Sequence, residues 1–210
     1  MKKIAIIDYG AGNLRSVHKS FLKVSNNKHE IIVTSNYHHV LNADYVVLPG
    51  VGAFGDCMNG VLALNGMADT IKEVVLNQKK PFMGICVGMQ LLAEKGFEYG
   101  EHKGFGFFKG NITKIDGKGL KIPHMGWNEL NLNFEHEVFS SVESGKSHVY
   151  FVHSYHLTDF DEKEVIATTD YGNQKIVAAV LKDNIIGLQF HPEKSQEVGL
   201  NIIKNFINWG

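Results

Sequence analysis

A cysteine flanked by glycines in GICVG, residues 84–88, is the strongest chemical signal in the sequence. It directly follows the apolar run PFMGI and leads into the helical pattern MQLLAEK. This order is typical of a nucleophile elbow, a tight strand-to-helix turn that small neighbours permit and that presents Cys86 at the carboxyl end of a strand. The helix beginning there also helps to stabilise a thiolate. Taken alone, the pattern leaves a buried structural cysteine as the alternative.

A cysteine nucleophile needs a base, and the segment QFHPE at 189–193, which continues the apolar pattern IIGLQF, is the best supplier. In an extended segment residues i and i+2 project to the same side, so His191 and Glu193 should reach one site, with Pro192 holding their geometry. Glu193 would then orient the imidazole and stabilise its protonated form, as the third member of a triad does. Without Cys86, an ordinary turn with a solvated carboxylate would be the better interpretation.

A third signal is the loop LPGVG at 48–52, again at the end of an apolar strand pattern. Its glycines allow close approach to a ligand or rotation of a peptide, and the amides of Val51 and Val87 could together form an oxyanion hole. A plain strand-terminating turn is the alternative. Open α/β sheets place their sites at the carboxyl ends of strands, so the three signals favour one site for acyl transfer.

Composition bounds the kind of protein that carries these residues. The chain has 210 residues, 44% of them hydrophobic and 20% charged, and a formal net charge of -1. These values predict a globular domain spanning 1–210 and exclude broad electrostatic attraction to nucleic acid or anionic lipid. The apolar run at the start ends at Asp8, too early for a signal peptide or membrane span. Two cysteines in unlike contexts indicate free thiols, hence a cytoplasmic location.

Apolar runs alternate with amphipathic stretches in the first half, which predicts an α/β fold with a mostly parallel central sheet flanked by helices. The expected strands are 4–8, 30–34, 45–49 and 81–85, and the expected helices 13–24, 56–78 and 87–95. From Gly104 onward, shorter segments rich in β-branched and aromatic residues predict an additional antiparallel portion. These segments are 106–115, 148–155, 164–171, 175–182 and 185–190, and a closing helix is expected within 195–210.

With GICVGMQLL as the nucleophile motif and FHPE as the base motif, the whole chain resembles the class I, or triad-type, glutamine amidotransferases. The resemblance implies a flavodoxin-like fold and hydrolysis of glutamine to glutamate and ammonia through a cysteinyl thioester, with no metal or organic cofactor. More narrowly, the segments at 8–17, 48–54, 123–128 and 150–156 resemble the glutaminase subunits of histidine biosynthesis. The implied partner is a (β/α)8-barrel cyclase subunit, which forms a heterodimer with the glutaminase and uses its ammonia.

The resemblance also assigns roles to residues at matching positions. Cys86, His191 and Glu193 match the catalytic triad, and the amides of Val51 and Val87 match the oxyanion hole. The positions that hold the amino-acid end of glutamine are matched by Gly52, Gln90, Glu98, Ser154 and Tyr155. Those that face the cyclase around the ammonia passage are matched by Asn13, Trp127, Tyr150 and Lys194.

Several of these residues have simpler interpretations. Glu98 could be a surface carboxylate because the loop after Lys95 varies in length, Trp127 and Tyr150 could be core aromatics, and Lys194 could be a solvated lysine. His124, His153 and His156 lack the carboxylate or thiolate pattern of a metal site, so core or hydrogen-bonding roles are favoured. Cys57 is interpreted as structural.

Three rival functions follow from the same motifs. A paralogous subunit could supply ammonia to a sugar-modifying synthetase, although the segments PHMGWN and YFVHSYH favour the histidine branch. A stand-alone cysteine hydrolase of related fold would take its histidine from near the nucleophile, whereas the base motif here lies about a hundred residues further on. A catalytically dead regulatory subunit conflicts with the intact cysteine, histidine and glutamate.

Overall fold

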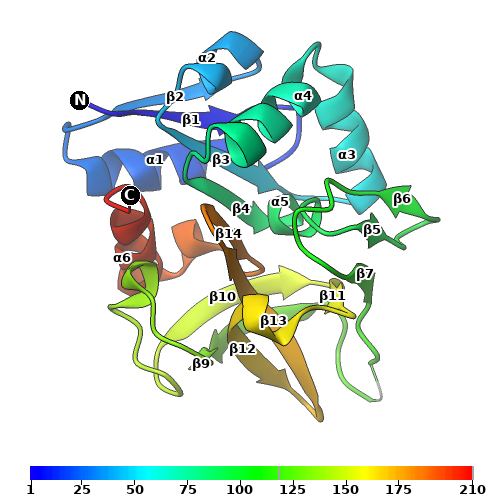
Figure 1. The fold of residues 1–210 in the computed structure, drawn as a ribbon. Coiled ribbons are helices and arrows are strands. Elements are labelled where there is room, and N and C mark those ends of the chain that lie inside the picture. The colour runs from blue at the N-terminus through cyan, green and yellow to red at the C-terminus, as the bar shows by residue number, and fades with distance from the viewer. Residues whose placement is uncertain (118, 210) are drawn as a thin grey trace.

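The central sheet has eight strands in the order β2-β1-β3-β4-β14-β13-β12-β9 in a computed structural model that describes residues 1–117 and 119–209 (Figure 1). The first five run parallel in the flavodoxin-like order. They are β2 (Glu30–Thr34), β1 (Lys3–Ile7), β3 (Tyr45–Gly50), β4 (Phe82–Cys86) and β14 (Ile185–Leu188). The last three are antiparallel to their neighbours: β13 (Gln174–Lys182), β12 (Val165–Tyr171) and β9 (Asn131–Leu132).

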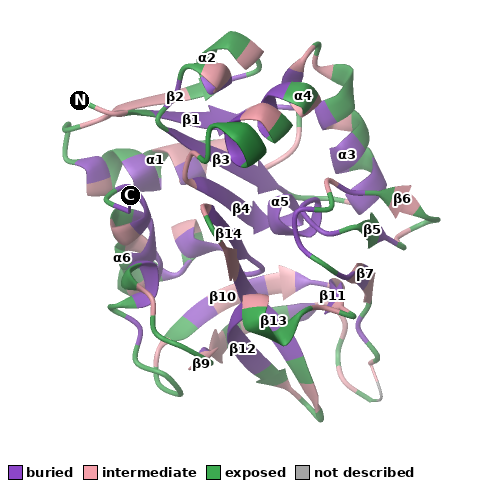
Figure 2. Ribbon diagram, in the orientation of Figure 1, coloured by how far each residue is buried: buried purple, intermediate pink, exposed green. Residues whose placement is uncertain are grey.

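Helices cover both faces of the parallel half of this sheet (Figure 1). Helices α1 (Leu14–Ser25) and α6 (Gln196–Phe206) lie side by side on one face, where the rings of Phe21 and Phe206 meet edge to face at 6.4 Å. The other face carries α2 (Tyr37–Leu41), α3 (Phe54–Ala63), α4 (Met67–Lys72) and the π-helical turn η1 (Glu73–Asn77). Strands β3 and β4 are buried along their whole length between these layers, which explains their continuous apolar sequences (Figure 2).

Two smaller sheets accompany the second half of the chain. One pairs β8 (His124–Glu129) with β10 (His148–His153), and the other has the order β11-β7-β5-β6. Its strands are β11 (Tyr155–Thr158), β7 (Asn111–Lys114), β5 (Lys95–Gly96) and β6 (His102–Lys103). The remaining elements are α5 (Val87–Gln90) and the 3-10 turns η2 (Glu137–Phe139), η3 (Glu162–Glu164) and η4 (Pro192–Lys194).

The predicted strands of the first half are confirmed to within a residue or two, and the closing helix lies within its expected range. Two expected helices were wrong in extent, and one expected antiparallel segment is confirmed only in part. The helix expected at 56–78 is divided into α3, α4 and η1, with Gly66 left-handed at the division. The helix expected at 87–95 ends at Gln90, because carbonyls of 91–93 accept hydrogen bonds from amides of 105–108. The segment at 185–190, expected to be antiparallel, is antiparallel to β13 on one side. On its other side, β14 pairs in parallel with β4.

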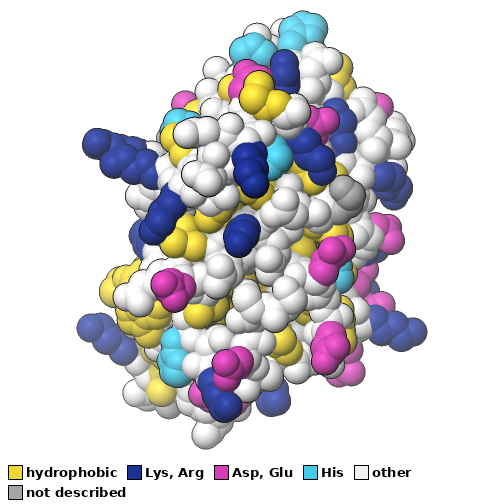
Figure 3. Space-filling model, turned by 90° about the vertical axis from the view of Figure 1, so that its left-hand side faces the viewer, with side chains coloured by type: hydrophobic (Ala, Val, Ile, Leu, Met, Phe, Trp, Pro, Cys, Tyr) yellow, Lys and Arg dark blue, Asp and Glu magenta, His cyan; other side chains and the backbone are white. Residues whose placement is uncertain are grey.

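One face of the molecule carries charges of both signs (Figure 3). On the face that includes α1 and α6, lysine and arginine side chains are mixed with acidic ones (Figure 3). This mixture agrees with the near balance of 21 basic and 22 acidic residues. Among residues 1–117 and 119–209, no helix is long and apolar enough to cross a lipid bilayer.

Candidate active site

The turn that holds Cys86 has the strained geometry of a nucleophile elbow. Cys86 ends β4 with φ 54° and ψ -112°, and α5 begins at the next residue. A backbone of this kind costs about 1–3 kcal/mol and persists only where its surroundings impose it. Gly88 is part of those surroundings, since a Cβ there would lie 1.8 Å from the carbonyl oxygen of Leu48. The glycine therefore lets α5 approach β3 closely enough to form the turn.

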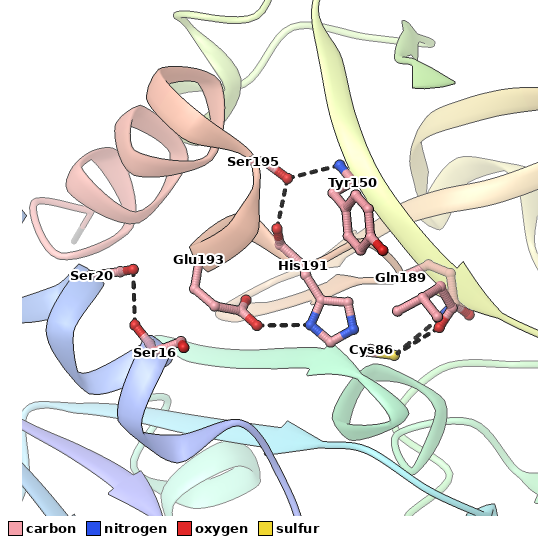
Figure 4. A network of polar contacts seen from close by, with 9 residues as sticks. Ser16, Ser20, Cys86, Tyr150, Gln189, His191, Glu193 and Ser195 are labelled. Atoms are coloured by element: carbon pink, nitrogen blue, oxygen red, sulfur yellow. Dashed lines mark hydrogen bonds and ion pairs between the residues drawn. The ribbon is translucent and has the colours of Figure 1, made fainter. Parts of the chain in front are cut away.

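The base motif lies directly beside this turn, because β14 is the parallel neighbour of β4. The imidazole of His191 is held through its Nδ1, which lies 2.8 Å from Oε1 of Glu193. The backbone of His191 is held separately, because its N–H donates to the carbonyl of Tyr150 at 2.9 Å. Figure 4 shows the imidazole between Glu193 and Cys86. The sequence predicted that Glu193 orients His191, but it predicted an extended segment for the two residues. Pro192 instead begins the 3-10 turn η4.

The electrostatic surroundings keep His191 protonated. Its side chain and that of Glu193 are only 2% and 1% exposed. Burial by itself would lower the pKa of His191, but the interaction with Cys86, the hydrogen bond to Glu193 and the charges of both partners outweigh it and raise the pKa to about 9. Nε2 of His191 makes no close hydrogen bond to any other described residue, so it can serve a reacting group beside Cys86.

A cavity of about 300 Å³ opens in front of Cys86. It brings together the cysteine, His191 and all seven residues predicted for the oxyanion hole and the substrate. Its lining is Val51, Gly52, Cys86, Val87, Gln90, Glu98, Pro123, Val152, His153, Ser154, Tyr155, His191 and Lys194. Glu98, for which a surface carboxylate was the alternative, faces the cavity, and its Oε2 accepts a hydrogen bond of 2.9 Å from the amide of Phe54 at the start of α3.

The loop after β3 supplies part of the cavity wall. Val51 is 41% exposed, and Gly52 has φ +111°, a backbone that other residues rarely adopt. The carbonyl of Val51 accepts a hydrogen bond from the Cys57 thiol at 3.4 Å. Cys57 is buried on α3 and thus supports the loop from behind, in line with a structural role.

Three of the four residues predicted to face a partner form one cluster beside the cavity. Trp127 on β8 is 47% exposed, and its ring meets that of Tyr150 edge to face at 6.1 Å. The ammonium of Lys194 lies 5.7 Å from the centre of the Tyr150 ring. Trp127 is therefore not a core aromatic. Asn13 stands at the start of α1, where its side chain makes no capping hydrogen bond.

The histidines near β8 and β10 act as hydrogen-bonding groups. His124 Nδ1 lies 3.0 Å from His153 Nε2, and His153 Nδ1 lies 2.9 Å from the carbonyl of Tyr155. Burial lowers the pKa of His124 to about 4 and that of His153 to about 3, so both are neutral at pH 7. His156 is buried, and its Nδ1 has no hydrogen-bond partner among the described residues. No group of three potential metal ligands occurs in residues 1–117 and 119–209.

Two buried residues of the site were missed from the sequence. Ser195 is fully buried and its hydroxyl donates to the carbonyl of His191 at 2.6 Å while accepting from the amide of Tyr150 at 2.9 Å (Figure 4). Gln189 is also fully buried and approaches the sulfur of Cys86. Their adjacency to the base motif was the available signal, but serine before a helix and glutamine at a strand end have many ordinary uses.

The matches with known proteins agree with this geometry. Residues 5–209 match the family model described as Glutamine amidotransferase class-I. The chain belongs to this family.

Full-length relatives refine the assignment. Imidazole glycerol phosphate synthase subunit HisH of Pelagibacter ubique (strain HTCC1062) is 46% identical over 207 residues, which cover 98% of this chain and 99% of that protein. The subunit of the same name from Rhodospirillum rubrum is 46% identical over 213 residues, covering 99% of each chain. Within the class, the chain thus groups with the HisH subunits of imidazole glycerol phosphate synthase.

Solved structures of lower identity share the fold. PurLQS from Thermotoga maritima has a TM-score of 0.72 at 20% identity and covers 100% of this chain and 99% of its own. Another solved structure, described as a glutamine amidotransferase, has a TM-score of 0.73 at 18% identity, covering 98% of this chain and 97% of its own. These likenesses confirm the expected α/β fold with a central sheet flanked by helices.

Proposed function

We propose that this chain hydrolyses glutamine to glutamate and ammonia, with Cys86 as nucleophile, His191 as base and acid, and Glu193 as the group that orients His191. The observation that carries the proposal is the arrangement of these three residues at one cavity. Cys86 sits in a strained elbow, and the buried imidazole beside it is bonded to Glu193 at 2.8 Å. This is the constellation by which cysteine hydrolases attack carbonyl groups.

In the proposed reaction, the thiolate of Cys86 attacks the side-chain carbonyl carbon of glutamine. The negative charge that develops on the carbonyl oxygen is stabilised by the amides of Val51 and Val87. His191, protonated at rest, donates its proton to the leaving nitrogen, and ammonia departs as the thioester forms. A water molecule then attacks the thioester while His191 accepts a proton from it. Release of glutamate restores the thiolate of Cys86 beside protonated His191, and the proton of the new carboxylic acid passes to solvent.

The walls of the cavity suit the other end of the substrate. A glutamine whose carboxamide lies at Cys86 would place its amino and carboxylate groups among Gly52, Gln90, Glu98, Ser154 and Tyr155. The carboxylate of Glu98 and the amide oxygen of Gln90 can accept hydrogen bonds from the ammonium group. The backbone and hydroxyl groups of Gly52, Ser154 and Tyr155 offer donors to the carboxylate.

The raised pKa of His191 predicts the alkaline limit of the reaction. The proton that leaves with ammonia is present on His191 below its folded-state pKa of about 9 and is lost above it. Because the pKa of His191 is raised from 6.5 to about 9 on folding, its protonation adds to the free energy of unfolding. That contribution is complete below about pH 6.5 and is lost as the pH rises through about 9. We expect kcat/KM for glutamine to decline with a midpoint near pH 9. A midpoint near 6.5, the ordinary value for histidine, would contradict this assignment.

The proposed destination of the ammonia is a cyclase subunit with a (β/α)8 barrel, in the synthase of histidine biosynthesis. Membership of the HisH group supports a synthase partner. The partly exposed cluster of Trp127, Tyr150 and Lys194, together with Asn13, is the proposed docking surface, since Lys194 both joins the cluster and lines the cavity. Residues 1–210 would act as one glutaminase domain, without a cofactor or metal, in the cytoplasm.

Association with the cyclase tests this assignment against the paralogous one. The purified chain should co-elute with a (β/α)8-barrel cyclase of histidine biosynthesis as a 1:1 complex in size-exclusion chromatography, and Trp127→Ala should weaken that complex. Association instead with a sugar-modifying synthetase, and not with the cyclase, would favour the rival function.

A further inference from the structure

Two buried glutamine side chains connect the nucleophile to the far wall of the cavity. Gln90 on α5 is 3% exposed, and Gln189, which follows β14, is 0% exposed. The Nε2 of Gln90 lies 3.1 Å from the carbonyl oxygen of Tyr155 and 3.0 Å from Oε1 of Gln189. The Nε2 of Gln189 lies 3.9 Å from the sulfur of Cys86. Figure 4 shows this last contact beside the imidazole of His191.

The backbone carbonyl of Tyr155 determines the orientation of both amides. A carbonyl oxygen can only accept, so the atom of Gln90 that faces it must be the NH₂ group. That group also faces Gln189, which must therefore present its oxygen to Gln90. The remaining NH₂ group of Gln189 is thereby directed at Cys86. This series of hydrogen bonds begins at a backbone acceptor. Turning either amide over would therefore place oxygen against oxygen or NH₂ against NH₂.

The same bonds determine what each amide can offer. Gln90 uses both of its N–H groups on the protein and keeps only its carbonyl oxygen for a ligand in the cavity. That oxygen suits the ammonium group of an amino acid. Gln189 uses its oxygen on Gln90 and directs its NH₂ group at the sulfur. An N–H directed at a thiolate stabilises the charged form and restrains the position of the sulfur.

We propose that Gln189 is a positioning residue that serves both ends of the site: its N–H holds the reactive sulfur of Cys86, and its oxygen holds Gln90 in the orientation that accepts the substrate ammonium. This inference rests on the proposed glutaminase function, since it takes Cys86 as the nucleophile. Gln189 acts on the substrate only through Cys86 and Gln90. It has no role in the triad or the oxyanion hole.

Two substitutions of Gln189 distinguish its contact with Cys86 from its contact with Gln90. Gln189→Met keeps a similar length and removes both polar atoms, whereas Gln189→Glu keeps an oxygen for Gln90 and removes the N–H that faces the sulfur. Alkylation of Cys86 by iodoacetamide at pH 7 should slow about tenfold in both variants, the loss expected for one hydrogen bond to a charged group. In a Cys86→Ala background, the Kd of glutamine should rise about tenfold for Gln189→Met and less than about threefold for Gln189→Glu.

Each measurement is made on the full chain, with the alkylated residue identified by peptide mass and folding checked by circular dichroism. The exposed Gln78→Met serves as the matched control, because it removes an amide outside the cavity and should leave both values unchanged. Wild-type alkylation rates in either folded Gln189 variant would overturn the inference. Absence of glutamate release by the wild-type chain with its cyclase would instead overturn the proposed function, whatever Gln189 does.

Discussion

Replacement of Cys86 by alanine should reduce glutamine hydrolysis by at least about 10⁴-fold and leave the fold intact. Triad members act as a unit, so loss of the nucleophile removes nearly all covalent catalysis and leaves only binding and the oxyanion hole. The substitution deletes one sulfur that faces a cavity, and the backbone strain at this position is unchanged because alanine keeps a Cβ. Glutamate release in the presence of the cyclase measures the effect, and thermal unfolding checks the fold.

The other thiol provides the matched control. Cys57→Ser keeps a donor for the carbonyl of Val51, so it should retain at least a tenth of the wild-type rate. A complex that contains Cys86→Ala should make no imidazole product from glutamine, yet should make it from an ammonium salt at a pH that populates free ammonia. If ammonium fails to rescue a correctly folded and associated complex, this chain does chemistry beyond ammonia release. Near-wild-type hydrolysis by Cys86→Ala would refute the triad.

The isolated chain should be a poor glutaminase that gains about 10²–10³-fold in turnover when the cyclase and its ligand are added. One missing oxyanion donor has an effect of this size. Val51 is exposed at the rim of the cavity, and glycines on both sides of it allow its peptide to rotate. Binding of the partner would then favour the orientation in which the Val51 amide faces the developing charge.

The measurement compares glutamate release by the same concentration of chain with and without a saturating amount of cyclase. A gain confined to kcat, with little change in KM, would agree with an oxyanion donor, since that donor acts in the transition state. Alkylation of Cys86 should change little on association, because the triad is already assembled in the chain alone. Full turnover by the free chain would argue against this activation.

Local sequence determined the elements that carry the chemistry. The parallel strands are continuous apolar runs because both of their faces are covered, and this pattern is visible without any tertiary information. The elbow around Cys86 was equally readable, because only glycine fits where α5 meets Leu48. Cys86, His191 and the loop at Val51 followed from motifs at strand ends, whereas the substrate residues followed from the family resemblance. The cavity brings both groups together.

Tertiary contacts decided what local pattern could not. Helix α5 stops at Gln90 because a loop more than ten residues further on binds the carbonyls that follow it. Strand β14 forms a hairpin with β13, but it also pairs in parallel with β4. His191 meets Glu193 through a 3-10 turn that depends on contacts with β10. Gln189 reaches Cys86 from 103 positions away, and the carbonyl of Tyr155 orients its amide through Gln90. Such contacts leave no periodicity in the sequence, because each joins single residues from separate elements. A periodic pattern arises only where one face of a single helix or strand is buried along its length.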